Sequence, residues 1–226
     1  MRLPLFLIAA GFATLVQAHT VFETDLVCPI GGQTFKAVLA GSGTSFGKFL
    51  DLKPYGPIAA PWPLAKCPDN GFVIFKETFT DAELERLTAF VASPAYREMK
   101  DVHSPYYLAA ALQQEIGAAP ERVAFTLLQA TWEAGDERYH SYAAAALDAY
   151  VRLLDAAPGD DRQRLTHRLI AGELERRLGH FDAAARRFQA LQDEATLPPF
   201  IRSVIALQQK LIAARNASQQ PMPRGQ

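Results

Sequence analysis

The fold of this chain is decided by residues 104–135, SPYYLAAALQQEIGAAPERVAFTLLQATWEAG. Ser104-Pro105 combines a helix-capping residue with proline at the first helical position, and Gly117 supplies a left-handed stop. Pro120 then opens a second helix, which ends at Gly135. The stretch therefore predicts two consecutive helices with a short connection.

Similar signals predict further helices on both sides of this pair. Upstream, Thr80-Asp81-Ala82-Glu83 resembles a capping box, in which threonine and glutamate bond the free N–H groups at a helix start. Downstream, helices are predicted in four segments, which are residues 139–154, 161–178, 181–193 and 198–214. Residues 80–215 are therefore expected to form a helical domain. The tail 216–226 lacks apolar content and is expected to be disordered.

Two of the downstream segments match each other at an offset of 38 residues. The matching residues are Ala146, Tyr150 and Leu153 in the first and Ala184, Phe188 and Leu191 in the second. A small, an aromatic and an apolar residue at this spacing are typical of the second helix of a tetratricopeptide repeat, whose period is about 34 residues. The match is degenerate, because no tryptophan stands at the expected first-helix position of the second unit. We expect tetratricopeptide-like helical pairs, with an irregular helical bundle as the alternative.

The region before residue 80 has a different composition. It is rich in glycine and proline, so only short strands are expected, at residues 33–39 and 72–75. Residues 19–79 are therefore expected to form a separate small unit. The chain as a whole is predicted to be mostly α, with a small β/loop cap on a helical domain.

The first 18 residues have the three-part pattern of a cleavable signal peptide. Arg2 is a positive start, residues 3–16 are apolar, and Val16-Gln17-Ala18 fits a signal-peptidase site. The apolar run is shorter than the roughly 20 residues that span a bilayer. We expect cleavage after Ala18, no stable membrane insertion, and a periplasmic or secreted mature protein. A buried N-terminal helix is the alternative.

The charge balance argues against nucleic acid as a partner. The 23 Lys and Arg residues are spread among 24 Asp and Glu residues, for a net charge of -1. Affinity for phosphate surfaces needs clustered cations. The densest basic cluster, residues 162–177, is interleaved with acids, so we expect it to form a solvated helix face.

The two cysteines lie in similar pentapeptides, Cys28-Pro29-Ile30-Gly31-Gly32 and Cys67-Pro68-Asp69-Asn70-Gly71. Both resemble the C-P-x-C-G knuckle of zinc ribbons, but Gly31 and Asn70 replace the second cysteine. The chain is similar to an uncharacterised bacterial family in which two such knuckles flank a short segment of the type S-G…L-D…Y-G-P-I…P-x-P-L. A tetratricopeptide-like helical region follows in that family. The residues that match this segment are Ser42-Gly43, Leu50-Asp51, Tyr55-Gly56-Pro57-Ile58 and Pro61-Trp62-Pro63-Leu64. The resemblance implies a fold and no established activity.

This resemblance implies a zinc-ribbon-like cap that has lost its metal. Two thiolates without a well-placed histidine cannot complete a four-ligand zinc site. The sulfurs of such a site need only a modest contraction to form a disulfide, which an oxidising compartment preserves. We therefore expect a Cys28–Cys67 disulfide, with two buried free thiols as the alternative.

No complete catalytic motif is found, and we expect no catalytic residue, no cofactor and no structural metal. Residues 41–48 do not fit a phosphate-binding loop, and Asp51 and Asp69 are expected to be turn residues instead of paired catalytic acids. Signal cleavage would make His19 the N-terminus, whose amino group and imidazole could chelate copper if a second histidine lay close. That copper site is a minor alternative.

The leading functional hypothesis is a non-catalytic binding or scaffold module for a protein or peptide partner. Stacked helical pairs offer an extended concave surface, although this step is an analogy between folds. Candidate groove residues, chosen from helix faces, are Tyr106, Tyr107, Trp132 and Arg176. The competing hypothesis is an envelope enzyme or metal-binding protein that uses the loop 41–64 or His19.

Overall fold

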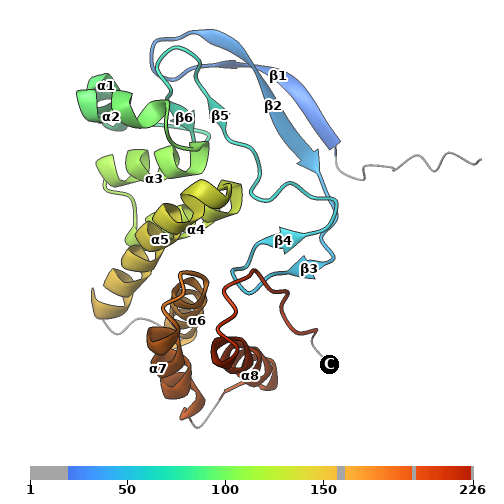
Figure 1. Cartoon of the computed structure of the whole chain (residues 1–226). Helices are drawn as coiled ribbons and strands as arrows, with labels where there is room; N and C mark the ends of the chain where they lie inside the picture. Colours follow the sequence, from blue (N-terminus) through green and yellow to red (C-terminus); the bar gives the residue numbers. More distant parts are fainter. Residues whose placement is uncertain (1–19, 157–160, 195–196, 225–226) are drawn as a thin grey trace, which may run out of the picture.

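The computed structural model describes residues 20–156, 161–194 and 197–224. These residues form three two-stranded antiparallel sheets followed by eight helices, so the chain is mostly helical, as predicted (Figure 1). The strands are β1 (Thr20–Val27), β2 (Thr34–Ser42), β3 (Gly47–Lys48), β4 (Pro54–Tyr55), β5 (Ala65–Lys66) and β6 (Val73–Ile74). The helices are α1 (Asp81–Ala92), α2 (Pro94–Lys100), α3 (Pro105–Glu115), α4 (Pro120–Glu133), α5 (Asp136–Ala156), α6 (Asp161–Arg177), α7 (Phe181–Gln192) and α8 (Pro199–Ala213).

The two cysteine pentapeptides form the turns of two hairpins, β1–β2 and β5–β6. The backbone N–H of Cys28 donates to the Gln33 carbonyl at 2.8 Å, and that of Gly32 donates to the Cys28 carbonyl at 3.1 Å. The second turn repeats this pattern, with bonds of 2.7 Å from Cys67 to Phe72 and 3.0 Å from Gly71 to Cys67. The similar sequences therefore fold into turns with the same backbone hydrogen bonds.

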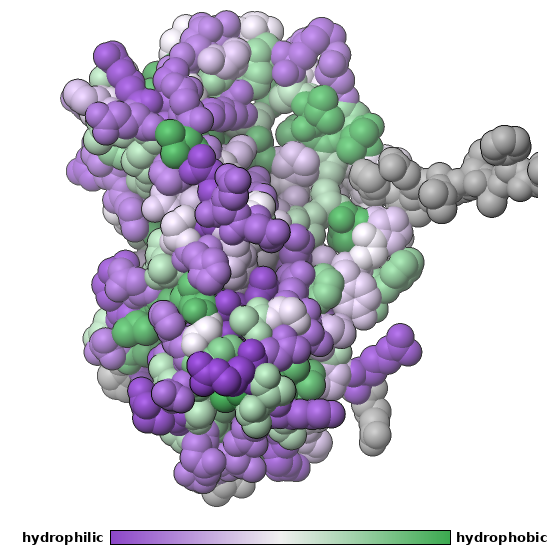
Figure 2. Space-filling model, viewed as in Figure 1, coloured by the Kyte–Doolittle hydropathy of each residue, from purple (hydrophilic) through white to green (hydrophobic). Residues whose placement is uncertain are grey.

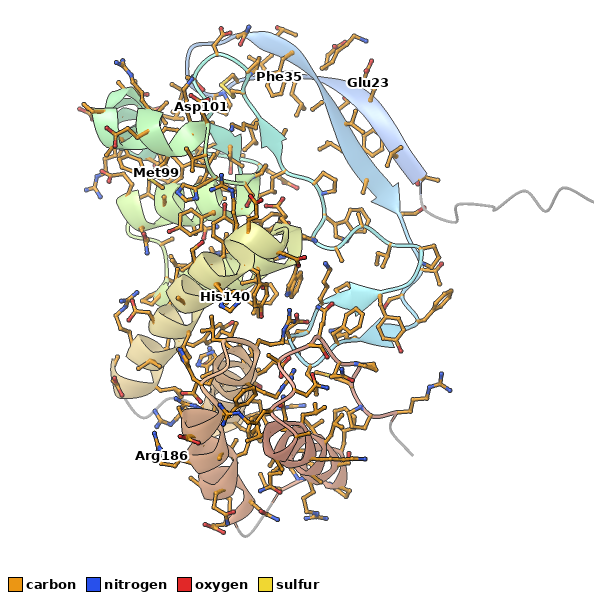
Figure 3. All side chains as sticks on the ribbon, in the orientation of Figure 1. Glu23, Phe35, Met99, Asp101, His140 and Arg186 are labelled. Carbon is orange, nitrogen blue, oxygen red and sulfur yellow. A yellow bond between two sulfur atoms is a disulfide. The ribbon has the colours of Figure 1, made fainter. Side chains whose placement is uncertain are left out.

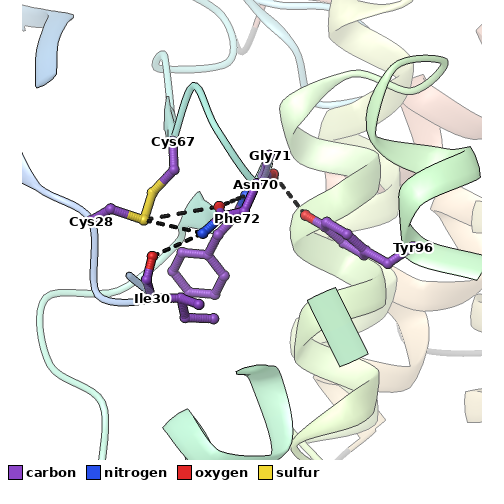
Figure 4. The surroundings of a disulfide bond; sticks show 7 residues. All are labelled: Cys28, Ile30, Cys67, Asn70, Gly71, Phe72 and Tyr96. Carbon is purple, nitrogen blue, oxygen red and sulfur yellow. Dashed lines mark hydrogen bonds between the residues drawn. A yellow bond between two sulfur atoms is a disulfide. The ribbon is translucent and has the colours of Figure 1, made fainter. Parts of the chain in front are cut away.

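The disulfide between Cys28 and Cys67 is present, which confirms the predicted pairing. Its two Cα atoms are 5.8 Å apart, and both cysteines are buried. Asn70 connects the two turns, because its Nδ2 donates to the Ile30 carbonyl at 2.8 Å while its Oδ1 accepts from the Phe72 N–H at 2.9 Å (Figure 4). The Asn70 side chain thus ties the two turns together beside the disulfide.

The disulfide end of the cap is anchored on the first helices. Phe72 and Val73 are fully buried in one cluster with Leu87 of α1, Tyr96 of α2 and Leu108 of α3. The Tyr96 hydroxyl also donates to the Gly71 carbonyl at 2.8 Å. The cap and the helical region therefore share a hydrophobic core.

Most helices start where the sequence signals predicted, but α5 starts at Asp136, before the predicted residue 139. The capping box at Thr80 is formed in full, with both its Thr80 and Glu83 bonds, and α3 and α4 begin at Pro105 and Pro120. Helix α2 was not predicted, although it begins at Pro94 after Ser93, the same cap-and-proline signal as at Ser104-Pro105. Strand β1 was not predicted either, although its alternating pattern runs up to Cys28.

From α3 onward each helix packs on the next one in the chain, through α8. The approach of α6 and α7 is close, because a Cβ atom on Gly172 would lie 2.7 Å from the Phe188 ring. Phe188 is fully buried there, together with Ala184 and Leu191. A glycine on one helix and an aromatic ring on its neighbour thus set this spacing.

The expectation of a disordered tail is wrong for residues 216–224, while residues 225–226 lie outside the described part. After α8 the chain returns to β3: Pro221 forms a β-bridge with Phe49, and the Leu50 N–H donates to the Gln220 carbonyl at 2.9 Å. Met222 packs beside Leu50 against α8. The tail is ordered by backbone pairing, which its polar composition does not reveal.

The cap consequently contacts both ends of the row of helices. Its disulfide turns lie on α1 to α3, whereas Leu50 packs against Val204 and Leu211 of α8. Figure 1 shows the cap extending along the helices, from β5 and β6 beside α3 to β3 and β4 beside the C-terminal segment.

No helix in the described ranges is long and apolar enough to cross a membrane. The predicted signal peptide and His19 lie outside those ranges, so export remains a prediction.

Candidate functional site

Two of the aromatic residues predicted to line a partner groove, Tyr106 and Trp132, hold the cap to the helices instead. Tyr106 is buried and its hydroxyl donates to the Trp62 carbonyl at 2.9 Å. Trp132 is buried as well, and its indole N–H donates to the Asp51 carbonyl at 3.2 Å. Both bonds reach the segment 41–64, so Tyr106 and Trp132 belong to the interior.

Tyr107 is half-buried in a stack of rings. Its ring centroid lies 4.3 Å from that of His103 and 4.5 Å from that of Tyr142. The Tyr142 hydroxyl is 3.2 Å from His103 Nδ1 and accepts from the Ser104 N–H at 3.0 Å. The stack therefore stabilises the start of α3.

Burial lowers the pKa of His103, with a further lowering from Arg138. A folded-state pKa below the unfolded value of about 6.5 means that the native state resists protonation. Stability is then lost as the pH falls from about 6.5 through the folded pKa. We expect His103→Phe, which keeps the ring stack, to reduce the loss of unfolding free energy between about pH 6.5 and 5 in urea titrations. The exposed His180→Phe is the matched control, and an equal change in both variants would contradict the prediction.

Arg176, the fourth predicted groove residue, is completely buried. It donates from Nε and Nη2 to the Glu173 carboxylate at 2.9 and 2.7 Å, and from Nε to Gln208 Oε1 at 3.0 Å. It also bonds the carbonyl oxygens of Asn216 and Ser218. The expected solvated face is thus wrong at Glu173 and Arg176, because α8 and the tail cover them.

Asp51 lies in the segment 41–64, which the competing hypothesis of an enzyme or metal-binding protein invokes. Like Arg176, it is buried and hydrogen-bonded. It is 1% exposed; its Oδ1 accepts from the Lys53 N–H at 3.1 Å, and its Oδ2 accepts from Gln219 at 2.7 Å and Arg177 at 3.3 Å. A carboxylate with all these bonds acts as a structural anchor for the loop and the tail.

A groove lies elsewhere, between the α3–α4 connection and helices α5 and α6. Its volume is about 470 Å³, and its lining is mainly apolar. The apolar lining residues are Ala118, Pro120, Val123, Ala149, Leu153 and Ala156. Figure 2 shows small, separate hydrophobic patches among hydrophilic side chains on the viewed face. Sequence reasoning missed this groove, although the Ala149 and Leu153 spacing on α5 is a signal for an apolar stripe.

The rim of the groove carries charges of both signs. Glu121 stands at the start of α4, Arg152 is paired with Asp148 on α5, and Arg164 bonds the Leu154 carbonyl at 3.2 Å. Burial lowers the pKa of His167, with a smaller raising effect of Glu121. An apolar floor inside a polar rim is the usual anatomy of a binding surface.

Among the described residues, no group of three or more His, Cys, Asp or Glu side chains is placed to hold a metal ion. His19, the candidate for copper, lies outside the described residues.

Comparison with known proteins gives no match of significance: neither a family model, nor a curated protein, nor a solved structure is similar to this chain.

Proposed function

We propose that this chain is a non-catalytic, exported protein- or peptide-binding module. The observation that carries the proposal is the apolar groove between the α3–α4 connection, α5 and α6, with its polar rim. The groove receives apolar anchor side chains of a peptide segment, and the rim residues Glu121, Arg152 and Arg164 contact the polar positions beside the anchors. Interfaces commonly combine a buried apolar centre with a charged, wetter edge.

A tetratricopeptide-like origin of the helices fits this use. Contacts between consecutive helices, from α3 to α8, are those of a stacked array. The two aligned aromatics, Tyr150 and Phe188, are buried, and so are the two aligned alanines, Ala146 and Ala184. These pairs support the interpretation of residues 141–154 and 181–192 as equivalent second helices.

A zinc-ribbon-like origin of the cap is supported by its two turns. Both have the same backbone hydrogen bonds, and the positions of the missing cysteines face each other: a Cβ on Gly31 would lie 3.9 Å from Asn70 Nδ2. Asn70 and the disulfide then occupy the place of a lost metal centre. In this proposal the cap is a structural brace, and binding is left to the helices.

Export is consistent with this disulfide, since such bonds persist outside reducing compartments. The predicted signal peptide at residues 1–18 would give the mature protein a periplasmic or secreted location.

The proposal is tested with a phage-displayed library of random dodecapeptides panned on residues 19–226. Enriched peptides are expected to share an apolar anchor. Leu153→Gln is expected to weaken their binding about tenfold or more, because loss of a buried apolar contact costs about 1–2 kcal/mol. Dissociation constants from fluorescence anisotropy check this.

Two further variants guard against misfolding. Ala156→Arg places a charge on the groove from an exposed position, so it should block binding without disturbing the core. Phe200→Gln, which removes a 40% exposed ring of α8 outside the groove, should leave binding unchanged. Peptides that bind the Leu153→Gln and Ala156→Arg variants as tightly as the wild type would overturn the proposal.

A further inference from the structure

A second cavity lies where the cap, α5, α6 and the tail meet. Its volume is about 500 Å³. Its lining comes from Lys53 in the cap, from Tyr139 and His140 at the start of α5, from Arg177 at the end of α6, and from Gln219 in the tail. Figure 3 labels His140, at the start of α5, between the upper and lower groups of helices. None of these residues lines the groove described above.

The cavity carries two cations against one buried acid. The Arg177 guanidinium lies 4.2 Å from the centre of the Tyr139 ring and reaches Asp51 Oδ2 at 3.3 Å. The Lys53 ammonium donates to the Trp132 carbonyl at 2.8 Å, and burial is the main cause of its lowered pKa. Lys53 and Arg177 together carry two positive charges, and Asp51 and the exposed lining residue Asp136 together carry two negative ones.

Two polar atoms of this wall lack a partner within the described residues. Arg177 Nε and the Tyr139 hydroxyl are both buried and make no hydrogen bond there. Buried polar groups are almost always hydrogen-bonded, and an unpaired one calls for an explanation. The arginine N–H is a donor only, so its missing partner must be an acceptor.

The buried carboxylate of Asp51 is already occupied. Both carboxylate oxygens of Asp51 accept bonds from the loop, Arg177 and the tail. The start of α5 adds the positive end of a 21-residue helix, which favours a negative charge. The cavity thus combines the positive end of a helix with two buried polar groups that have no partner among the described residues.

We propose that this cavity binds a small organic acid through its carboxylate. A carboxylate supplies the acceptor oxygens that Arg177 Nε and the Tyr139 hydroxyl lack. A planar carboxylate matches the geometry of the arginine fork, and the volume falls in the range of small-molecule sites. The ligand reaches Lys53 and Arg177 from the cavity, and a small shift of the stacked Arg177 and Tyr139 side chains brings their unpaired donors onto the same carboxylate.

The site does not depend on the peptide groove, so either proposal can fail alone. The carboxylate could belong to a free acid or to the C-terminus of a peptide. N-acetylalanine, its amide and an acetylated pentapeptide with a free C-terminus distinguish these sources in calorimetric titrations of residues 19–226. We expect the acid to bind and the amide not to bind. A pentapeptide that binds at least as tightly as the acid assigns the carboxylate to a peptide end, and a weaker one assigns it to a free acid.

Variants tie the binding to the cavity. Arg177→Gln is expected to weaken binding of N-acetylalanine at least about tenfold, as for loss of a charge-assisted bond. Tyr139→Phe removes only the hydroxyl that has no partner, so it should weaken binding while leaving the melting temperature of the free protein unchanged or higher. Lys48→Gln removes an exposed cation outside the cavity and should leave binding unchanged.

Three results would overturn the proposal. They are equal binding of the acid and its amide, tighter binding of inorganic phosphate than of the acid, and wild-type affinity in both Arg177→Gln and Tyr139→Phe. The Tyr139→Phe variant keeps the test decisive if Arg177→Gln unfolds, because it retains every hydrogen bond of Asp51.

Discussion

Replacing both cysteines, as Cys28→Ala with Cys67→Ala, is expected to lower the free energy of unfolding by about 4 kcal/mol. The disulfide links residues 39 positions apart, and in the chain-entropy model a closed loop of this length contributes about that amount. The bond also joins two turns that share a core with α1 to α3, so local order there should fall as well. Urea unfolding, followed by circular dichroism, measures the loss.

Reductant provides the control for this prediction. It should destabilise the wild type by a similar amount and have no effect on the double alanine variant. If the reduced wild type unfolds at the same urea concentration as the oxidised protein, the disulfide is not a stabilising element.

Arg176→Met is expected to cost about 3–5 kcal/mol of unfolding free energy. Removing one partner of a buried ion pair leaves the other as an uncompensated charge, here Glu173, which is fully buried. Burial already raises the pKa of Glu173, opposed mainly by Arg176. The loss of the bonds to Asn216 and Ser218 should also free the tail, so the amides of Leu50 and Met222 should exchange faster with deuterium.

Two variants separate the buried pair from a general loss of charge. Arg186→Met, on an exposed arginine of the next helix, should change stability by less than about 0.5 kcal/mol. Combining Glu173→Leu with Arg176→Met should recover part of the loss, because an apolar pair avoids the stranded charge. A cost for Arg176→Met no larger than that of Arg186→Met would refute the role given to the network.

The helices were predictable because their ends carry local chemistry. Proline at the first position and glycine after the last turn act within one or two residues, so α3 and α4 begin where Pro105 and Pro120 predicted. The disulfide was predictable for a similar reason, since two related pentapeptides mark the positions of the cysteines.

Predictions from charge and composition were wrong where contacts with residues distant in the sequence determine whether a side chain is buried or a segment is ordered. Arg176 lies on a helix rich in charges, and its burial depends on Gln208 from α8 and on carbonyl groups of the tail. The tail is polar, and its order comes from backbone pairing with residues near Phe49. Local patterns do not encode contacts of this kind.

The same limit applies to both proposed binding sites. Faces of single helices suggested Tyr106 and Trp132 as groove residues, whereas the segment 41–64 covers them. The donor-lined cavity combines Lys53, Tyr139 and Arg177, which are far apart in the chain. Only the three-dimensional arrangement brings them together.

The contact of the cap with both ends of the helical row has a mechanical consequence. Open arrays of helical pairs flex along their length and can gain or lose a pair, because each pair meets only its neighbours. Here the cap contacts both ends of the row, α1–α3 at one end and α8 at the other. Bending the row, or inserting one more pair between α5 and α6, would pull Leu50 away from α8. These contacts at both ends restrict the curvature of the row and the number of its helices. The row should therefore be more rigid than an open array of helical pairs.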